Sequence, residues 1–181
     1  ASPVSSMRFA GISPEIGLAE AQQTLVLNGL RDQVRLQTDG QLKTARDVII
    51  MAMLGADEFS FGTLPLIVLG CLMMRKCNTN TCPVGVATQD ETLRAKFRGR
   101  AEYVVNFFTF LAQQTREYLS ELGVRHLKDI IGRTDMIEVI PQDKSSKLGT
   151  IDFSRLLHRP DTDKALHWDR SEFTRVSIVK D

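Results

Sequence analysis

Two strand–turn–helix units follow one another between residues 34 and 74, and this repetition limits the fold more than any other feature of the sequence. Each unit has a short strand, a glycine turn and an apolar helix: residues 34–37, Asp39-Gly40 and 48–54, then residues 56–61, Gly62-Thr63 and 65–74. Consecutive units of this kind predict a parallel sheet whose loops, at the carboxyl ends of the strands, face a common ligand. A complete eight-stranded barrel needs about 250 residues. We therefore expect an α/β fold that contains only part of such a sheet.

Local signals fix the ends of these helices. Thr44 and Asp47 form a capping-box-like pair before the first helix, and Gly55 allows that helix to end in a left-handed residue. Pro65 is suited to the first turn of the second helix, which we expect to continue to residue 74. In residues 34–37 the alternation predicts that every second side chain is buried.

Two longer helices are expected on either side of these units. Ser13 followed by Pro14 predicts a helix that runs to about residue 28, with the serine hydroxyl as its cap. Residues 101–122 place apolar side chains at helical spacing and predict an amphipathic helix. We expect its phenylalanines to pack against the sheet rather than to line a cofactor site.

The character of the sequence changes after Gly132. Residues 144–147 are a polar linker, and the last forty or so residues show little periodicity. We expect one domain in residues 1–132, followed by an extended or poorly ordered tail in residues 133–181.

Charge and hydropathy exclude several classes of partner. The 23 basic and 22 acidic residues leave a net charge of +1 and form no long basic block, so nucleic acid is not an expected partner. The apolar stretches 48–54 and 64–74 are too short to cross a bilayer, and the first residues lack the pattern of an export signal. We therefore expect a soluble, cytoplasmic protein. Because the chain begins at Ala1 in a Ser- and Pro-containing run, we also expect further sequence upstream.

Three cysteines within twelve positions are the sharpest chemical signal. Cys71, Cys77 and Cys82 have thiolates that can converge on one soft metal centre, and Pro83 follows the last of them. An iron–sulfur cluster with one vacant corner needs three thiolates, whereas structural zinc needs a fourth strong ligand that the nearby sequence lacks. Buried, inert thiols are the remaining alternative.

The two glycine turns are a second candidate site. Asp39-Gly40 and Gly62-Thr63 can hold a phosphate, because glycine lets backbone N–H groups approach the oxygens. Alone this signal is weak, because glycine turns are common, and plain connections between strand and helix are the simpler interpretation.

Residues 36–44, 54–59 and 70–89 together resemble the large chain of glutamate synthase. The resemblance is strongest around Gly70-Cys71, Cys77 and the run Thr81-Cys82-Pro83-Val84-Gly85-Val86-Ala87-Thr88-Gln89, and it extends from Ala1 to about residue 131. Residues 152–161 also resemble the segment that leads into the family's final domain. Ala45 and Asn78 stand where the family commonly has glycine and histidine.

The resemblance implies the carboxyl-terminal portion of an FMN-binding TIM barrel, the (β/α)8 fold, with an additional helical segment. In that domain 2-oxoglutarate and glutamine-derived ammonia form an imine, which reduced flavin converts to L-glutamate. Cys71, Cys77 and Cys82 match the ligands of a 3Fe-4S cluster that passes electrons to FMN. Asp39, Gly40, Gly62 and Thr63 match loops that hold the flavin phosphate. No residue of this chain is implied as catalytic.

The implied partners lie outside the chain. They are the rest of the large chain and an electron donor, either an NADPH-dependent small subunit or ferredoxin, and a plastid location accompanies the ferredoxin form. Two other functions fit the same residues: a non-catalytic partial-barrel module for electron relay or assembly, and a zinc-binding interaction domain.

Overall fold

A computed structural model describes residues 4–161 and 163–169 and shows a mixed α/β arrangement. The helices before the first strand are α1 (Val4–Phe9) and α2 (Pro14–Leu27). The two units then follow as β1 (Gln37–Asp39), α3 (Ala45–Leu54), β2 (Glu58–Ser60) and α4 (Thr63–Val68). After them come α5 (Glu91–Arg94), α6 (Ala101–Glu121) and the short 3-10 helices η1 (Leu127–Ile130), η2 (Thr134–Met136) and η3 (Leu148–Thr150).

The two strands pair in parallel, as the repeated units predict. Thr38 lies opposite Phe59 in the register, and Asp39 lies opposite Ser60. Both strands therefore end at the same edge, and the loops that begin at Gly40 and Phe61 leave from that edge. This common edge brings the two glycine turns close together.

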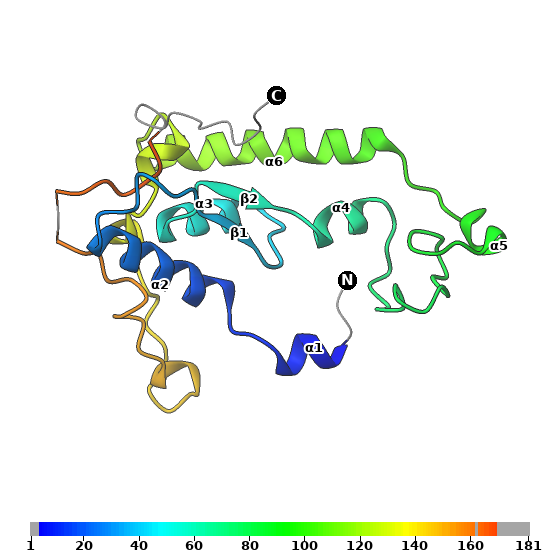
Figure 1. Ribbon diagram of the computed structural model, residues 1–181, viewed down its shortest axis with the longest axis horizontal. Coiled ribbons are helices and arrows are strands. Elements are labelled where there is room, and N and C mark those ends of the chain that lie inside the picture. The colour runs from blue at the N-terminus through cyan, green and yellow to red at the C-terminus, as the bar shows by residue number, and fades with distance from the viewer. Residues whose placement is uncertain (1–3, 162, 170–181) are drawn as a thin grey trace, which may run out of the picture.

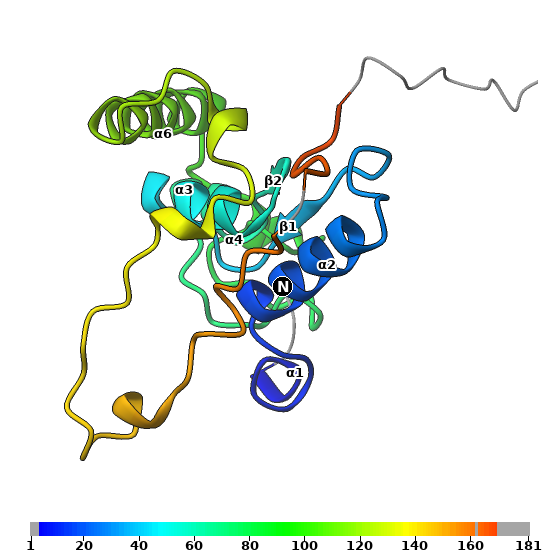
Figure 2. The ribbon, with the colours of Figure 1, turned by 90° about the vertical axis from the view of Figure 1, so that its left-hand side faces the viewer.

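Helix α3 is the centre of the packing. Helix α2 packs against one side of α3, and helix α6 packs against another side of α3 (Figures 1 and 2). Leu18, Met51 and Leu54 belong to one core cluster, and Ile49 and Leu119 belong to a second. Seven of the ten residues of α3 are buried, which explains why its sequence from Val48 onward is apolar on all faces.

The ends of α3 agree with the sequence signals. The Thr44 side chain accepts the Asp47 N–H at 3.2 Å, and the Asp47 carboxylate accepts the Thr44 N–H at 2.9 Å, so the capping box is confirmed. Gly55 ends the helix at φ 121°, a conformation that favours glycine. In the described residues, no helix is both long and apolar enough to cross a membrane.

Three local predictions were wrong in detail: the bounds of the first strand, the burial of Val34 and the cap of α2. The first strand begins at Gln37 rather than ending there, and Val34 is exposed. The physical reason is that the Leu36 N–H donates to the Asp57 side chain (Oδ2, 2.8 Å) instead of to a backbone partner in the sheet. The Ser13 hydroxyl makes no backbone cap to α2 and instead donates to the Glu15 carboxylate.

The fourth helix is also shorter than predicted, which changes the setting of the cysteines. It ends at Val68 because Gly70 turns the chain at φ 94° and the Cys71 N–H donates back to Leu66 O at 2.9 Å. Cys71 therefore lies in the loop after the helix and not on the helix itself.

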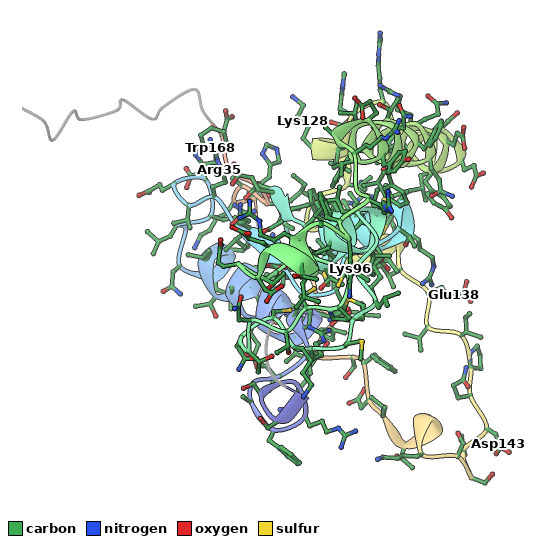
Figure 3. The ribbon with its side chains drawn as sticks, turned by 90° about the vertical axis from the view of Figure 1, so that its right-hand side faces the viewer. Arg35, Lys96, Lys128, Glu138, Asp143 and Trp168 are labelled. Atoms are coloured by element: carbon green, nitrogen blue, oxygen red, sulfur yellow. The ribbon has the colours of Figure 1, made fainter. Side chains whose placement is uncertain are left out.

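The tail returns to the core over part of its length. Thr134 is buried, and Leu156 and Leu157 pack against the cluster that contains Leu18. Further along, the Arg35 guanidinium lies 4.0 Å from the centre of the Trp168 ring, and Figure 3 shows these two side chains together. The prediction of an extended or poorly ordered tail is therefore too simple for residues 134–161 and 163–169, and residues 162 and 170–181 lie outside the described part.

Candidate functional site

One cavity of about 440 Å³ lies at the carboxyl ends of the two strands. Its walls come from the two turns after the strands, the start of α4 and the loop between α4 and α5. All seven residues singled out in the sequence line it: Asp39, Gly40, Gly62, Thr63, Cys71, Cys77 and Cys82. The structure thus brings together two sets of candidates that are separated in the sequence.

The glycine turns form one wall of the cavity and leave their backbone accessible. A Cβ atom at Gly62 would have no heavy atom within 4 Å, so its backbone faces open space. Gly40 has φ 142°, and a Cβ atom there would lie 2.8 Å from Pro14 Cγ. Glycine is therefore required at position 40 for close contact with α2, and at position 62 it leaves room for a ligand.

The loop after α4 forms the opposite wall and has an unusual backbone. Met73 and Arg75 line the cavity and have left-handed φ angles of 56° and 57°. Gln41, in the first turn, has φ 64° and also lines the cavity. Left-handed residues other than glycine are uncommon, and they gather at ligand sites when the surrounding structure holds them there.

Backbone N–H groups influence two of the cysteine thiols. The Met73 N–H donates to Cys71 Sγ at 3.4 Å. Cys82 is 7% exposed, and the pKa of its thiol is lowered. The backbone N–H of Ala87 is the main cause of the lower pKa. Burial of the thiol raises the pKa, but the N–H groups of Val84, Val86 and Gly85 lower it further.

These surroundings suit a thiolate ligand. The thiolate is the form of cysteine that binds metals, and backbone N–H groups stabilise its negative charge. All three cysteines are free thiols in the structure. Hydrogen bonds to sulfur are also typical of the outer shell of iron–sulfur clusters.

The structure brings the three sulfurs to one cavity but not into a ligand set. Within residues 4–161 and 163–169, no group of three or more His, Cys, Asp or Glu side chains is placed to hold a metal ion. The convergence of Cys71, Cys77 and Cys82 on a single centre therefore stays a prediction. Their shared cavity, the soft sulfur donors and the N–H groups around them fit a cluster chemically.

Sequence reasoning missed several residues of the cavity. Arg75 and Lys76 line it and bring positive charge next to Cys77. The basic pair directly before a cysteine was a signal that could have identified them, because cations attract the anionic groups of cofactors and substrates. Gln41 and Met73 gave no such signal, since their left-handed conformations are not readable from their residue types.

Comparison with known proteins gives a consistent result. Residues 1–125 match the model of the family described as the conserved region in glutamate synthase. The glutamate synthase NADPH large chain of Bacillus subtilis is 51% identical over 162 residues, which cover 89% of this chain and 11% of that protein. The corresponding large chain of Azospirillum brasilense is 57% identical over 140 residues, 77% of this chain and 9% of that protein.

A relative whose name gives a different electron donor has a comparable identity. Ferredoxin-dependent glutamate synthase 2 of a Synechocystis strain is 48% identical over 168 residues, which cover 93% of this chain and 11% of that protein. The chain therefore spans about a tenth of the length of these curated relatives.

Proposed function

This chain belongs to the glutamate synthase family, and from that premise we propose that it forms the carboxyl-terminal part of an FMN-binding (β/α)8 barrel that makes L-glutamate. The observation that carries the proposal is the single cavity lined by both glycine turns and all three cysteines. Ligands of parallel α/β sheets bind at the carboxyl ends of the strands, where this cavity lies. In this proposal residues 1–132 belong to the barrel domain and residues 133–181 lead toward a following domain.

Each wall of the cavity has its own role. Asp39, Gly40, Gly62 and Thr63 hold the flavin phosphate, because Gly62 leaves an accessible backbone on the cavity side. Cys71, Cys77 and Cys82 hold a 3Fe-4S cluster; the Met73 N–H donates to the Cys71 sulfur, and backbone N–H groups lower the pKa of the Cys82 thiol.

The two cofactors divide the chemistry. When bound, the cluster passes single electrons and the flavin collects two of them for the reductive conversion of 2-oxoglutarate and ammonia to L-glutamate. The residues of this chain position the two groups side by side and stabilise the thiolates. The groups that bind 2-oxoglutarate and move protons are supplied by the remainder of the large chain.

The electron donor is set outside this chain. Relatives of similar identity are named for NADPH, NADH and ferredoxin, so the residues that they share with this chain do not distinguish the donors. We propose a nicotinamide-dependent small subunit or ferredoxin as the partner. A cytoplasmic location, or a plastid one as in the relative named chloroplastic, belongs to the same proposal.

Iron analysis tests the proposal directly. The full-length protein reconstituted with iron and sulfide is expected to contain three irons per chain and FMN, and to show visible absorbance from the cluster. Cys77→Ser should abolish that absorbance. Met74→Leu is the matched control, because it removes a thioether sulfur from the same cavity wall and should leave iron content unchanged. Stoichiometric zinc with no iron in the reconstituted protein would reject the cluster and favour an interaction domain.

A complementation assay separates catalysis from assembly. The chain is mixed with the upstream barrel segment, and 2-oxoglutarate-dependent glutamate formation is measured. Restored turnover is expected if the chain completes the active barrel. A purely structural module would bind the upstream segment and restore no turnover.

A further inference from the structure

A second, much smaller cavity lies between α2 and the part of the tail that folds back over this helix. Its volume is about 10 Å³, and its walls come from α2, the end of α3, the start of η2 and the tail residues 156, 158–160 and 166. Two glutamines of α2 hold the tail beside it. Gln22 Nε2 donates to Leu166 O at 2.8 Å, and Gln23 Nε2 donates to Arg155 O at 2.9 Å. The cavity is therefore a gap in an interface whose two sides are already joined by hydrogen bonds.

One polar atom in the wall of this cavity needs a partner. Thr134 lines the cavity and is 7% exposed. Its Oγ1 is buried and makes no hydrogen bond within the part of the chain that the structure describes. Buried hydroxyl groups in folded proteins nearly always pair with a protein atom or an ordered water, because an unpaired one is costly.

The walls around Thr134 are fixed and cannot close over its hydroxyl. Gln22 Oε1 accepts from Arg31 Nε, while the Nε2 of the same side chain is held by Leu166. The Gly132 N–H donates to Ala52 O at 3.0 Å. A Cβ atom at Gly132 would lie 2.7 Å from Gln22 Nε2 and 3.4 Å from Leu166 Cβ, so the backbone and both side chains are already in close contact. The partner of the hydroxyl must therefore be a molecule that enters the gap.

Size and chemistry identify this molecule as water. A volume of about 10 Å³ is close to the smallest that holds one water molecule, and it excludes an organic ligand. Among the described residues, no Asp or Glu lines the cavity, so a hard metal cation would lack its preferred ligands. Cavities that stay empty are apolar, whereas this one has four polar lining residues besides Thr134: Gln22, Gln23, His158 and Arg159.

We propose that this cavity binds one ordered water molecule, which is hydrogen-bonded to the Thr134 hydroxyl and joins the tail to α2. A buried water typically makes about three hydrogen bonds, and its removal is costly. The site is independent of the proposed function, because none of its lining residues lines the cavity of the glycine turns and cysteines.

A high-resolution crystal structure of the full-length protein tests the proposal first. It should show an ordered water within about 3.2 Å of Thr134 Oγ1. Thr134→Val keeps the shape of the side chain and removes the hydroxyl, so the water should be lost. Thr134→Ser is the matched control, in which the hydroxyl and the water should both remain. A wild-type cavity without a water, or a protein group bonded to the Thr134 hydroxyl in its place, would overturn the proposal.

Hydrogen exchange of the amides in residues 132–137 gives a second measurement, in which the sign of the change decides. If the hydroxyl binds water, Thr134→Val removes a hydrogen bond, and exchange in the full-length protein should become about fivefold faster. If the hydroxyl is unpaired, Thr134→Val relieves the cost of a buried polar group, and exchange should become slower. Slower or unchanged exchange in Thr134→Val would therefore also overturn the water site.

Discussion

The guanidinium of Arg31 and the carboxylate of Asp57 form a buried ion pair, with Nη2 2.7 Å from Oδ2 and side-chain exposures of 1% and 9%. The pair joins the segments that lead into β1 and β2, because Arg31 also donates to Gly55 O and Asp57 accepts the Leu36 N–H. The ion pair lies at the amino ends of the two strands, whereas the cavity lies at their carboxyl ends. The two strands are thus fixed at one end by charge, while their other ends remain available for a ligand.

Removing one partner of this pair should destabilise the fold strongly. Asp57→Ala leaves the Arg31 charge buried without its carboxylate, and we expect a loss of about 3–5 kcal/mol in the free energy of unfolding. Urea denaturation of wild type and variant measures the difference. Glu58→Gln is the matched control, since it breaks the exposed pair with Arg35 and should change the free energy by about 0.5 kcal/mol. Equal effects of the two changes would contradict the assigned role of the buried pair.

Docking of the tail should weaken when Trp168 loses its contact with Arg35. The Trp168 N–H donates to Asp57 Oδ1 at 3.1 Å, and its ring stacks on the Arg35 guanidinium. We expect Arg35→Gln to weaken this docking by about 1 kcal/mol, the size of a partly exposed cation–π contact. Faster hydrogen exchange at residues 166–168 would report the change.

Glu58→Gln serves here too as the control, because it removes the ion pair of Arg35 and leaves the stacking in place. Exchange of the tail should then stay close to that of the wild type. A tail that exchanges as fast in Glu58→Gln as in Arg35→Gln would assign the docking to the ion pair instead.

The parts of the fold that depend on nearest neighbours in sequence were predictable. Thr44 and Asp47 form their capping box, Gly55 ends α3, and the amphipathic pattern places α6 within one residue of its observed end. The start of β1 was not predictable, because it depends on Asp57, a residue 21 positions after Leu36. Helix α4 ends early because of Gly70, a signal that is visible in the sequence. The prediction extended the helix to residue 74 because the residues up to that position are mostly apolar.

The candidate site was predictable as a set of residue types and not as a geometry. The cysteine spacing and the glycine turns identify seven lining residues of the cavity. The amides around Cys82 could not be inferred, because backbone N–H groups have no signature in residue type. The shape of this loop also depends on contacts of Asn80 and Gly85 with residues eight or nine positions later, which residue types alone do not reveal.

A side chain at position 85 should disturb the surroundings of Cys82. In Gly85→Ala the new Cβ would lie 2.5 Å from Leu93 O in a residue with φ 76°, so α5 or the loop must move. We expect the amides to withdraw from the sulfur, and the pKa of the Cys82 thiol to rise toward its ordinary value. Ultraviolet absorbance of the thiolate, followed against pH in cluster-free protein in which Cys71 and Cys77 are replaced by serine, measures the pKa.

Gly70→Ala is the comparison for this change. Gly70 also has a positive φ, 94°, but a Cβ atom there would meet nothing within 4 Å. Its substitution therefore introduces backbone strain of about 1–3 kcal/mol without a collision, and should leave the pKa of Cys82 unchanged. An equal rise of the pKa in both variants would indicate a general loosening of the loop.

The capping box of α3 should make the start of this helix sensitive to acid. Burial of the Asp47 carboxylate opposes its ionisation, but the N–H groups of Lys43 and Thr44 outweigh it and lower its pKa below the ordinary 3.8. A lowered pKa in the folded state means that the stabilisation is fully present above pH 3.8 and is lost as the pH falls through the lower, folded value.

Asp47→Asn removes this titration while keeping an oxygen that can accept from Thr44. The opening free energy of the amides in residues 48–51, obtained from hydrogen exchange and corrected for intrinsic rates, should be nearly constant from pH 6 to pH 4 in the wild type. Below that range it should fall in the wild type and stay level in Asp47→Asn. Because α3 packs against both α2 and α6, this loss should spread to the core clusters on its two sides. A wild-type profile parallel to that of Asp47→Asn would show that the ionised carboxylate contributes nothing to the helix start.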